Sequence, residues 1–330
     1  MTDNGRTLAA AIIAAAALGA TGPAQAETTL RLLSGWTPNN PNVPYVEAVF
    51  IKNVEEASKG EIKIRRNGPE VVPAFEQLQP VSTGVFDFLF TTPGYHQAQS
   101  GVGNILDAMK GDIEQRRGSG LVQWADDFYA RRFGLRILAV SPSPGNHFVL
   151  RENLGPEGTL KGLKVRSNAT FDGIVRQLGG TPVSMSPADA YSAMQKGVLD
   201  GITFPTFASS DYKLYEVGKY MTRPVFGLSN ILLMVNAKKL ASLPANLQQI
   251  LFEEGRKLEG IGKQALIGVD ARDEETMIKN GVKKTELSPT VAPKLNQMYN
   301  EGIYQTASRS TSDDVKAFWE LAKAKGMLNE

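Results

Sequence analysis

One arginine of the chain lies in a setting that suits recognition of an acidic ligand. Arg166 ends the segment Leu163-Lys164-Val165, whose apolar residues are typical of a short buried strand. The guanidinium of arginine is a planar fork that can bind both oxygens of a carboxylate at once. An arginine with this local sequence can equally lie on a solvated surface or in a structural ion pair. The residue types alone therefore leave both interpretations open.

Aromatic side chains are the other candidates for contact with a small ligand. One hydrogen bond to a charged group contributes about 1.5–3 kcal/mol, whereas a micromolar ligand requires about −8 kcal/mol. Arg166 cannot supply that affinity alone, so apolar contacts have to add the remainder. The aromatic candidates are Trp36, Tyr95, Phe171, Phe204 and Phe207. Each can also belong to an ordinary core, although the Gly-, Pro- and Asn-rich turn around Trp36 favours a binding role there.

His96 and His147 are the only histidines of the chain, and both lie near the ends of predicted strands. Either could donate a hydrogen bond to a hydroxyl or keto oxygen of a ligand, although a lone histidine is more often structural. Two histidines without an acidic cluster at ligand spacing do not make a zinc site. The chain also has no cysteine and no G-x-S-x-G motif. We therefore expect no metal site, no cofactor and no catalytic residues.

The N-terminus has the three parts of an export signal in the right order. Arg6 gives a positive start, residues 8–18 form an apolar run, and Ala24-Gln25-Ala26 is a small-residue cleavage site. A buried Ala-rich helix is the alternative interpretation. The pattern predicts a signal peptide over residues 1–26, Sec-type export to the periplasm and a mature chain that does not insert into the membrane.

Positive and negative charges are balanced along the chain, with 36 Lys and Arg against 34 Asp and Glu and a formal net charge of +2. Proteins that bind nucleic acids usually carry a strong basic patch. We therefore expect no nucleic-acid partner. A nearly neutral surface suits a small ligand better than a polyanion.

The elements that must position these residues follow an α/β pattern. Residues 28–33 predict a strand, residues 45–58 an amphipathic helix with apolar residues at helical spacing, and residues 61–66 a second strand. A β-α-β start of this kind predicts sheets flanked by helices. The fold class is therefore α/β, with mixed, mostly parallel sheets.

Two similar halves follow from a repeated signature. Residues 60–67 resemble residues 162–168, and Gly84-Val85-Phe86-Asp87 resembles Gly197-Val198-Leu199-Asp200. Each Gly-to-Asp signature predicts a helix end, a turn and a buried strand. Ligands lie beyond the carboxyl ends of such strands. The cleft residues predicted there are Thr91, Thr92, Tyr95, Phe204, Thr206 and Phe207.

The remaining pattern predicts how the two lobes are connected. Strands at residues 135–140 and 148–150 flank a Pro- and Gly-containing turn that suits a crossing between lobes, and residues 230–236 predict a strand that crosses back. Residues 247–279 contain few helix breakers and predict one long helix. We expect one lobe from residues 27–143 with about 230–270, and another from residues 144–229 with about 271–330.

Several segments together resemble one family, the extracytoplasmic solute-binding proteins of tripartite ATP-independent periplasmic (TRAP) transporters, DctP-like type. Residues 160–166 (LKGLKVR), 178–183 (LGGTPV) and 191–201 (YSAMQKGVLDG) match the family's G-[LM]-K-[ILV]-R strand, LGA-P turn and Y-x-A-[LM]-Q-x-G-x-[VL]-D-G helix end. Residues 236–244 (NAKKLASLP) and 55–62 (EEASKGEI) resemble two further segments. The resemblance covers essentially the whole mature chain.

The resemblance implies a two-lobed periplasmic binding protein with a long helix spanning both lobes. It implies that Arg166 pairs with a ligand carboxylate, that the lobes close on the ligand, and that membrane permease subunits are the partners. Asn146 and His147 lie where sialic-acid-binding relatives have a second arginine, and Thr92 and Phe204 lie where relatives have polar or acidic residues. These departures favour a monocarboxylate with an apolar or aromatic body. A receptor of an ATP-driven importer or, less favoured, a periplasmic α/β enzyme are the alternatives.

Overall fold

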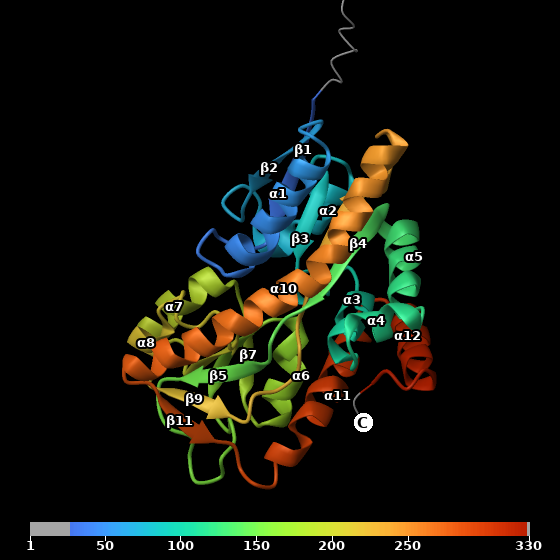
Figure 1. Ribbon diagram of the computed structural model, residues 1–330. Helices are drawn as coiled ribbons and strands as arrows, with labels where there is room; N and C mark the ends of the chain where they lie inside the picture. The colour runs from blue at the N-terminus through green and yellow to red at the C-terminus, as the bar shows by residue number, and fades with distance from the viewer. Residues whose placement is uncertain (1–26, 329–330) are drawn as a thin grey trace, which may run out of the picture.

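Two separate sheets, each with its own helices, form the two lobes (Figure 1). The structure is a computed structural model that describes residues 27–328; the predicted signal segment 1–26 lies outside the described residues. The α/β class and the two-lobed architecture predicted from the sequence are confirmed. Among the described residues, no helix combines the length and the apolar character required to cross a membrane.

The first lobe contains a five-stranded sheet with the order β2-β1-β3-β10-β4. β1, β2 and β3 run parallel, and β10 runs antiparallel to both β3 and β4. The strands are β1 (Thr28–Ser34), β2 (Ile62–Asn67), β3 (Phe88–Thr91), β4 (Leu135–Pro142) and β10 (Asn230–Asn236). Its helices are α1 (Ala48–Ala57), α2 (Leu78–Ser82), α3 (Val102–Ile105), α4 (Ile113–Gly118), α5 (Leu121–Phe133) and α9 (Ala237–Ala241). Short helical turns cover Val43–Glu47, Ala74–Glu76, Pro93–Tyr95 and Leu106–Ala108.

The second lobe contains a six-stranded sheet with the order β11-β9-β5-β8-β6-β7. Within it β6, β7 and β8 are parallel, whereas β5 runs antiparallel to β8 and β9. The strands are β5 (Asn146–Leu150), β6 (Lys164–Ser167), β7 (Thr181–Ser184), β8 (Gly201–Pro205), β9 (Tyr220–Arg223) and β11 (Lys283–Glu286). Its helices are α6 (Ala169–Gln177), α7 (Pro187–Gln195) and α8 (Leu214–Val217), and a short turn covers Ala292–Lys294.

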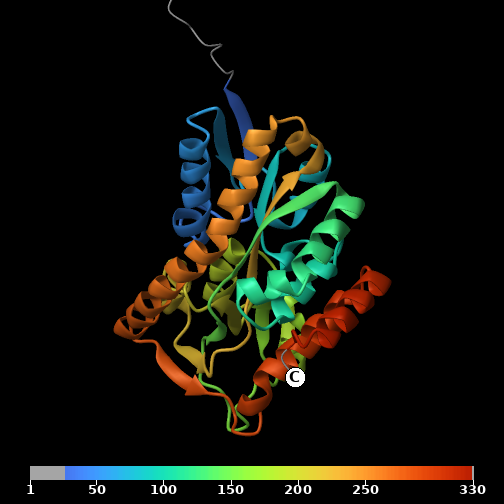
Figure 2. The ribbon, with the colours of Figure 1, turned by 45° about the vertical axis from the view of Figure 1, so that its right-hand side comes forward.

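Three segments connect the lobes. β4 ends in the first sheet and β5 begins in the second, so the chain crosses at residues 143–145, as the Pro- and Gly-containing turn predicted. The chain crosses back between β9 and β10. The third connection is α10 (Ala245–Lys279), which runs along both lobes (Figure 2) and begins two residues before the predicted helix.

Two glycines allow α10 to lie close to β4. A Cβ atom at Gly255 would approach the carbonyl oxygen of Leu138 to 2.7 Å, and one at Gly262 would approach Ser141 Oγ to 2.8 Å. Each glycine lowers intrinsic helix stability, so the close approach of helix and strand explains why the helix contains them. The long helix is therefore fitted to the crossing strand at the hinge.

The two C-terminal helices contact both lobes. α11 (Leu295–Ala307) packs on α6, whereas α12 (Ser312–Ala324) packs on α3 and α5. Trp124 of α5 stacks on Phe318 of α12, with ring centroids 4.7 Å apart. The residue limits of the two lobes stay a prediction, but this packing ties the end of the chain to the first lobe as well.

The repeated Gly-to-Asp signature has the same geometry in each lobe. Gly84 and Gly197 both adopt positive φ, near +82° and +73°, which is the left-handed region that glycine tolerates best. In each lobe the aspartate then binds the neighbouring strand: Asp87 Oδ2 accepts from the Arg31 amide at 2.6 Å, and Asp200 Oδ2 from the Lys164 amide at 2.8 Å. The matched landmarks thus mark equivalent strands, β3 and β8.

The strand pairing corrects one detail of the repeat. β6, which ends at Arg166 and Ser167, pairs with β8 as β1 pairs with β3, so its counterpart is β1 and not the edge strand β2. In this register Leu33 of the first lobe is equivalent to Arg166, and Arg65 on β2 is not. The guanidinium is therefore a feature of the second lobe alone.

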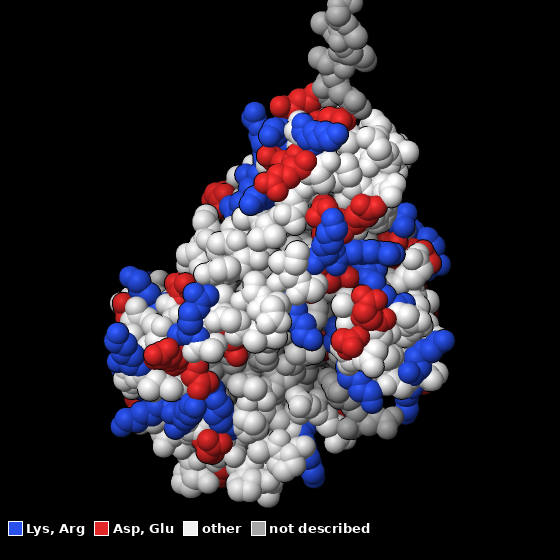
Figure 3. Space-filling view, in the orientation of Figure 1, with Lys and Arg blue, Asp and Glu red and all other residues white. Residues whose placement is uncertain are grey.

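Charges are mixed over the surface. Figure 3 shows Lys and Arg interspersed with Asp and Glu on this face, without an extended patch of one sign. This distribution matches the balanced composition of the sequence.

Candidate ligand-binding site between the lobes

A small cavity of about 40 Å³ lies between the lobes, beyond the carboxyl ends of β3 and β8. Both lobes contribute to its wall, and Arg166 is the one charged residue among the described residues that line it. The full lining consists of Trp36, Asn40, Asn42, Thr92, Tyr95, Ser143, Arg166, Asn168, Phe171, Pro187, Phe204, Pro205, Phe207, Ser229, Asn230 and Ile231.

Arg166 reaches the cavity from the end of β6 and is only 2% exposed. Its Nε donates to the Met185 carbonyl at 2.9 Å, and its Nη1 donates to the Thr203 carbonyl at 3.2 Å. These two bonds fix the plane of the guanidinium. The remaining nitrogen, Nη2, makes no hydrogen bond of good geometry among the described residues. The Tyr95 hydroxyl lies near enough to interact with the guanidinium, but a donating nitrogen of a fixed fork stays available for a better acceptor.

The charge of Arg166 is also unpaired. Among residues 27–328, no Asp or Glu forms an ion pair with it. Burial lowers the pKa of the guanidinium, and the nearby Tyr95 and Tyr212 hydroxyls partly offset this effect. Burial also raises the pKa of Tyr95 to about 12, so its hydroxyl stays neutral. A buried cation without a counter-ion is unfavourable, and an anion in the cavity would relieve that cost.

Aromatic rings form two walls of the cavity, one from each lobe. In the first lobe Trp36 lies edge-on to Phe90 at 5.2 Å and 6.0 Å from Tyr95. In the second lobe Phe204 has the Arg166 guanidinium 5.9 Å from its ring centroid, a distance at which cation–π attraction is effective. The cavity therefore combines one cation with apolar rings.

Trp36 is held by a buried ion pair behind it. The guanidinium of Arg66 donates to the Trp36 carbonyl and pairs with Glu47 at 2.6 Å. Glu47 is fully buried, and burial raises the pKa of its carboxyl despite the neighbouring Arg66 and Ser34. This pair orients the turn that carries the first aromatic wall.

Seven of the residues predicted for the cleft line the cavity, whereas Thr91 and Thr206 do not. The structure brings together Arg166, Trp36, Thr92, Tyr95, Phe171, Phe204 and Phe207. It does not bring Asn146 and His147 to this cavity. The Asn146 side chain instead faces the chain that crosses back, where its Nδ2 donates to the Phe226 carbonyl at 3.3 Å.

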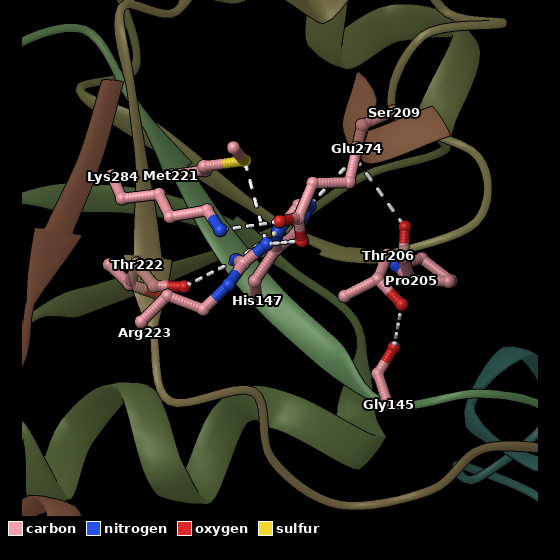
Figure 4. Close-up of polar contacts among 10 residues, drawn as sticks. All are labelled: Gly145, His147, Pro205, Thr206, Ser209, Met221, Thr222, Arg223, Glu274 and Lys284. Atoms are coloured by element: carbon pink, nitrogen blue, oxygen red, sulfur yellow. Dashed lines mark hydrogen bonds and ion pairs between the residues drawn. The ribbon is translucent and has the colours of Figure 1, made fainter. Parts of the chain in front are cut away.

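His147 takes part in a separate polar cluster on the second lobe (Figure 4). Its Nδ1 lies 3.4 Å from Arg223 Nη1 and its Nε2 lies 2.8 Å from Ser209 Oγ. An arginine nitrogen can only donate, so Nδ1 accepts and Nε2 carries the proton. Arg223 in turn binds Glu274, which also pairs with Lys284 at 2.6 Å. Both ring nitrogens are thus occupied by protein groups, and His147 supports the loop that carries Phe207.

His96 also lies away from the cavity, where one of its two ring nitrogens has a partner. Its Nε2 lies 2.8 Å from the Tyr129 hydroxyl, and its ring is 2% exposed. Among the described residues no group of His, Asp and Glu is arranged to hold a metal ion.

Apart from Arg166 and Thr92, the polar lining of the cavity was not predicted from the sequence. It comes from the turn after β1 (Asn40 and Asn42), from Asn168 directly after β6, and from Ser143, Ser229 and Asn230 at the crossings. The four polar residues in the breaker-rich turn at residues 37–42 were the available signal. No sequence pattern in the crossing segments indicated a binding role, because their distance from the cavity depends on how the lobes pack.

The lobes contact each other on both sides of the cavity. On one side the Tyr212 hydroxyl of the second lobe lies 3.3 Å from Asn40 Nδ2 and 3.5 Å from Thr37 Oγ1. On the other side Thr170 donates to Asp107 at 3.2 Å and accepts from Asn104 at 3.1 Å. On the Tyr212 side Asn39 Nδ2 also donates to the Asp211 carbonyl at 3.4 Å. The structure is therefore a closed arrangement with hydrogen bonds between the lobes on both sides of the cavity.

We expect the two buried histidines to make the protein sensitive to acid. Burial lowers the pKa of His147 to about 3, helped by the charge of Arg223, and lowers that of His96 to about 4. A folded pKa below the unfolded value of about 6.5 means that unfolding takes up protons. The stability contributed by each neutral histidine is present above about pH 6.5 and is lost as the pH falls.

The measurement is urea unfolding of the wild type and of His147→Gln at pH 7 and pH 5. Between pH 7 and pH 5 His147 lowers the free energy of unfolding of the wild type by about 2 kcal/mol, because only the unfolded chain protonates this histidine. The variant does not have this loss. The substitution should therefore destabilise the protein less at pH 5 than at pH 7, by about the same amount. Asp107 and Asp273, whose pKa values burial raises to about 7, act in the opposite direction but equally in both proteins. Equal destabilisation at both pH values would contradict the neutral His147.

Comparison with known proteins agrees with this architecture. The 2,3-diketo-L-gulonate-binding periplasmic protein YiaO of Escherichia coli K12 is 23% identical over 239 residues, which are 70% of this chain and 71% of YiaO. Alignments with two uncharacterized proteins of Haemophilus influenzae, 32% and 28% identical, span only 30% and 39% of the length of those proteins.

Solved structures with the same fold include TRAP receptors. A periplasmic solute-binding protein of Desulfovibrio salexigens with bound orotic acid has a TM-score of 0.80 at 17% identity, covering 90% of this chain and 98% of that one. A Bordetella pertussis extracytoplasmic solute receptor that binds pyroglutamic acid has a TM-score of 0.77 at 20% identity, covering 90% and 100%.

The family profile described as bacterial extracellular solute-binding protein, family 7 (DctP), matches residues 34–309. This range includes every strand of both sheets except β1, of which it contains only Ser34, together with the whole of α10 and every residue that lines the cavity. The chain belongs to this family, the DctP-like extracytoplasmic solute-binding proteins of TRAP transporters.

Proposed function

We propose that this protein is a periplasmic receptor that captures a small organic acid by closure of its two lobes and delivers it to the membrane permease subunits of a TRAP transporter. The observation that carries the proposal is Arg166, a fully buried guanidinium that has a free donating nitrogen and no ion-pair partner among the described residues. No catalytic role is proposed for any residue, since the described lining has no His, Asp or Glu to act as a base for its hydroxyl groups.

The proposed ligand is a monocarboxylate with an apolar or aromatic body. Arg166 is the single cation of the described lining, so a second carboxylate of the ligand would be buried without a counter-ion. Trp36, Tyr95, Phe171, Phe204 and Phe207 supply the apolar contacts that one arginine cannot replace. A ligand with a single negative charge, such as a monocarboxylate, therefore matches the charge of the site.

Ligand entry requires the lobes to separate. The cavity of about 40 Å³ is far below the roughly 300 Å³ or more of small-molecule pockets, and the contacts through Tyr212 and Thr170 close both sides. We propose that the protein without ligand is open on average and that ligand shifts it to the closed arrangement.

This closure predicts a change in size that small-angle X-ray scattering can measure. The radius of gyration of the protein without ligand should be larger than that of the protein saturated with an acid that binds. Arg166→Ala at the same acid concentration serves as the control and should stay open. Identical scattering with and without saturating acid would count against hinge closure.

The ligand class can be tested by native mass spectrometry of the purified protein, followed by calorimetry with the acid that is found. A co-purified monocarboxylic acid would support the proposal. A protein that carries and binds only dicarboxylates or uncharged solutes would refute the ligand class proposed here.

A further inference from the structure

The cavity contains a second polar group without a partner, on the lobe opposite Arg166. Asn42 lines the cavity from the turn after β1 and is 4% exposed. Its Oδ1 atom is buried and has no hydrogen-bond partner among residues 27–328. Buried carbonyl oxygens are nearly always paired in folded proteins, and each exception requires an explanation.

Local structure does not explain Asn42. It immediately precedes the helical turn Val43–Glu47, a position where an asparagine side chain usually accepts a backbone N–H of the following turn. No such capping bond is present, and the second residue of the turn is Pro44, which has no N–H to donate. The turn is stabilised instead by the backbone N–H of Asn42, which donates to Asn40 Oδ1 at 2.9 Å.

The two unpartnered groups have opposite hydrogen-bonding character. Arg166 Nη2 on the second lobe can only donate, and Asn42 Oδ1 on the first lobe can only accept. They line the same cavity but form no bond with each other. One bound molecule would satisfy both if it carried a carboxylate together with an N–H or O–H group.

We propose that Asn42 is a specificity-determining residue that accepts a hydrogen bond from the bound acid, so that the receptor selects carboxylates that also carry a ring N–H or a hydroxyl. This inference rests on the proposed role of Arg166 as the carboxylate anchor. An acid bonded to Arg166 and to Asn42 joins the two lobes, whereas an acid without a donor leaves the Asn42 oxygen buried and unpaired. Discrimination arises from that difference.

A matched pair of acids separates the two groups. Pyrrole-2-carboxylate and furan-2-carboxylate are flat five-membered rings with the same carboxylate, but the ring atom beside it is an N–H donor in one and an oxygen acceptor in the other. Indole-2-carboxylate and benzofuran-2-carboxylate form the same pair with a larger body. Calorimetry should show wild-type affinity at least about tenfold higher for the N–H member of each pair that binds.

Three variants make the test specific. Asn42→Leu, which is of similar size but has no acceptor, should bind both members of a pair with nearly equal affinity. Asn42→Asp keeps an acceptor and should keep the preference, even though its charge weakens binding of both acids and even if Asn42→Leu fails to fold. Asn39→Leu, in the same turn but exposed and outside the cavity lining, should keep the wild-type ratio.

The outcomes distinguish this inference from the proposed function. If Arg166→Ala no longer binds either acid of a pair, and if only Asn42→Leu loses the preference for the N–H acid, the results support both the carboxylate anchor and the role of Asn42. Equal wild-type affinity for the two members, or an unchanged ratio in Asn42→Leu, overturns the role of Asn42 and leaves the carboxylate anchor standing. Failure of the wild type to bind any of the four acids counts against the ligand class itself and overturns this inference with it.

Discussion

Replacing Arg166 with alanine should weaken binding of a carboxylic acid by about 100-fold or more while the protein still folds. The variant loses charge-assisted hydrogen bonds worth about 1.5–3 kcal/mol each, and 1.4 kcal/mol corresponds to a factor of ten in affinity. A carboxylate left in this cavity would then be buried beside Phe204 without any cation in the described lining. Isothermal titration calorimetry with the co-purified acid is the measurement.

The stability of the protein without ligand should change little in Arg166→Ala. The substitution removes the donors for the Met185 and Thr203 carbonyls, which is unfavourable. It also removes a buried charge that has no counter-ion, which is favourable. We expect the thermal midpoint of the variant to lie close to that of the wild type when both are free of ligand.

Two further variants provide the controls. Arg166→Lys keeps the charge but loses the planar fork, so its affinity should be intermediate. Arg65→Ala removes an arginine with a similar local sequence from the edge strand β2, outside the cavity lining, and should bind like the wild type. Unchanged affinity in Arg166→Ala would remove the proposed anchor and require a different site.

Replacing Gly173 with alanine should cause the largest loss of stability from a single added methyl group. α6 and α11 cross at Gly173 and Gly302, and a Cβ atom at Gly173 would lie 2.2 Å from Gly302 Cα. The obstructing atoms belong to the backbone, so the two helices would have to separate. Overpacking of this kind costs about 1–3 kcal/mol, which for a chain of this length we expect to lower the thermal midpoint by about 2–5 °C.

Gly268→Ala is the matched control, because Gly268 is also helical but a Cβ atom there meets nothing within 4 Å. The same substitution on the exposed face of α10 should stabilise the protein by up to about 1 kcal/mol through helix propensity. Differential scanning calorimetry of both variants measures the contrast. A Gly173→Ala variant as stable as the wild type would show that the α6–α11 contact is not as close as described.

Much of the architecture was predictable from local patterns. The strand predicted at residues 230–236 matches β10 residue for residue, and the helix predicted from residue 247 to 279 is α10 with two residues added at its start. Both segments are long and strongly patterned, so burial of the apolar residues allows one solution. The repeated Gly-to-Asp turns were recognisable because positive φ and a short acceptor side chain restrict the residue types there.

The candidate site was predictable only in part. Arg166 and the aromatic residues lie at or near strand ends, where the direction of a parallel sheet determines which residues meet. Asn146 and His147 precede the strand predicted at residues 148–150, but both belong to β5, which pairs in register with β8. Protein groups next to β5 occupy their side chains. A strand pattern indicates that a residue is buried without indicating which face or neighbour it receives.

The sequence by itself determined the class of protein and the two α/β lobes, and its resemblance to a family singled out Arg166 as the candidate anchor, because these depend on short-range patterns and on residue chemistry. The tertiary structure decided what surrounds that arginine. Whether Arg166 had a counter-ion, whether His147 reached the ligand, and whether Asn42 was left without a partner all depend on contacts between segments far apart in the chain. Such contacts follow from how the lobes pack, and no local pattern encodes them.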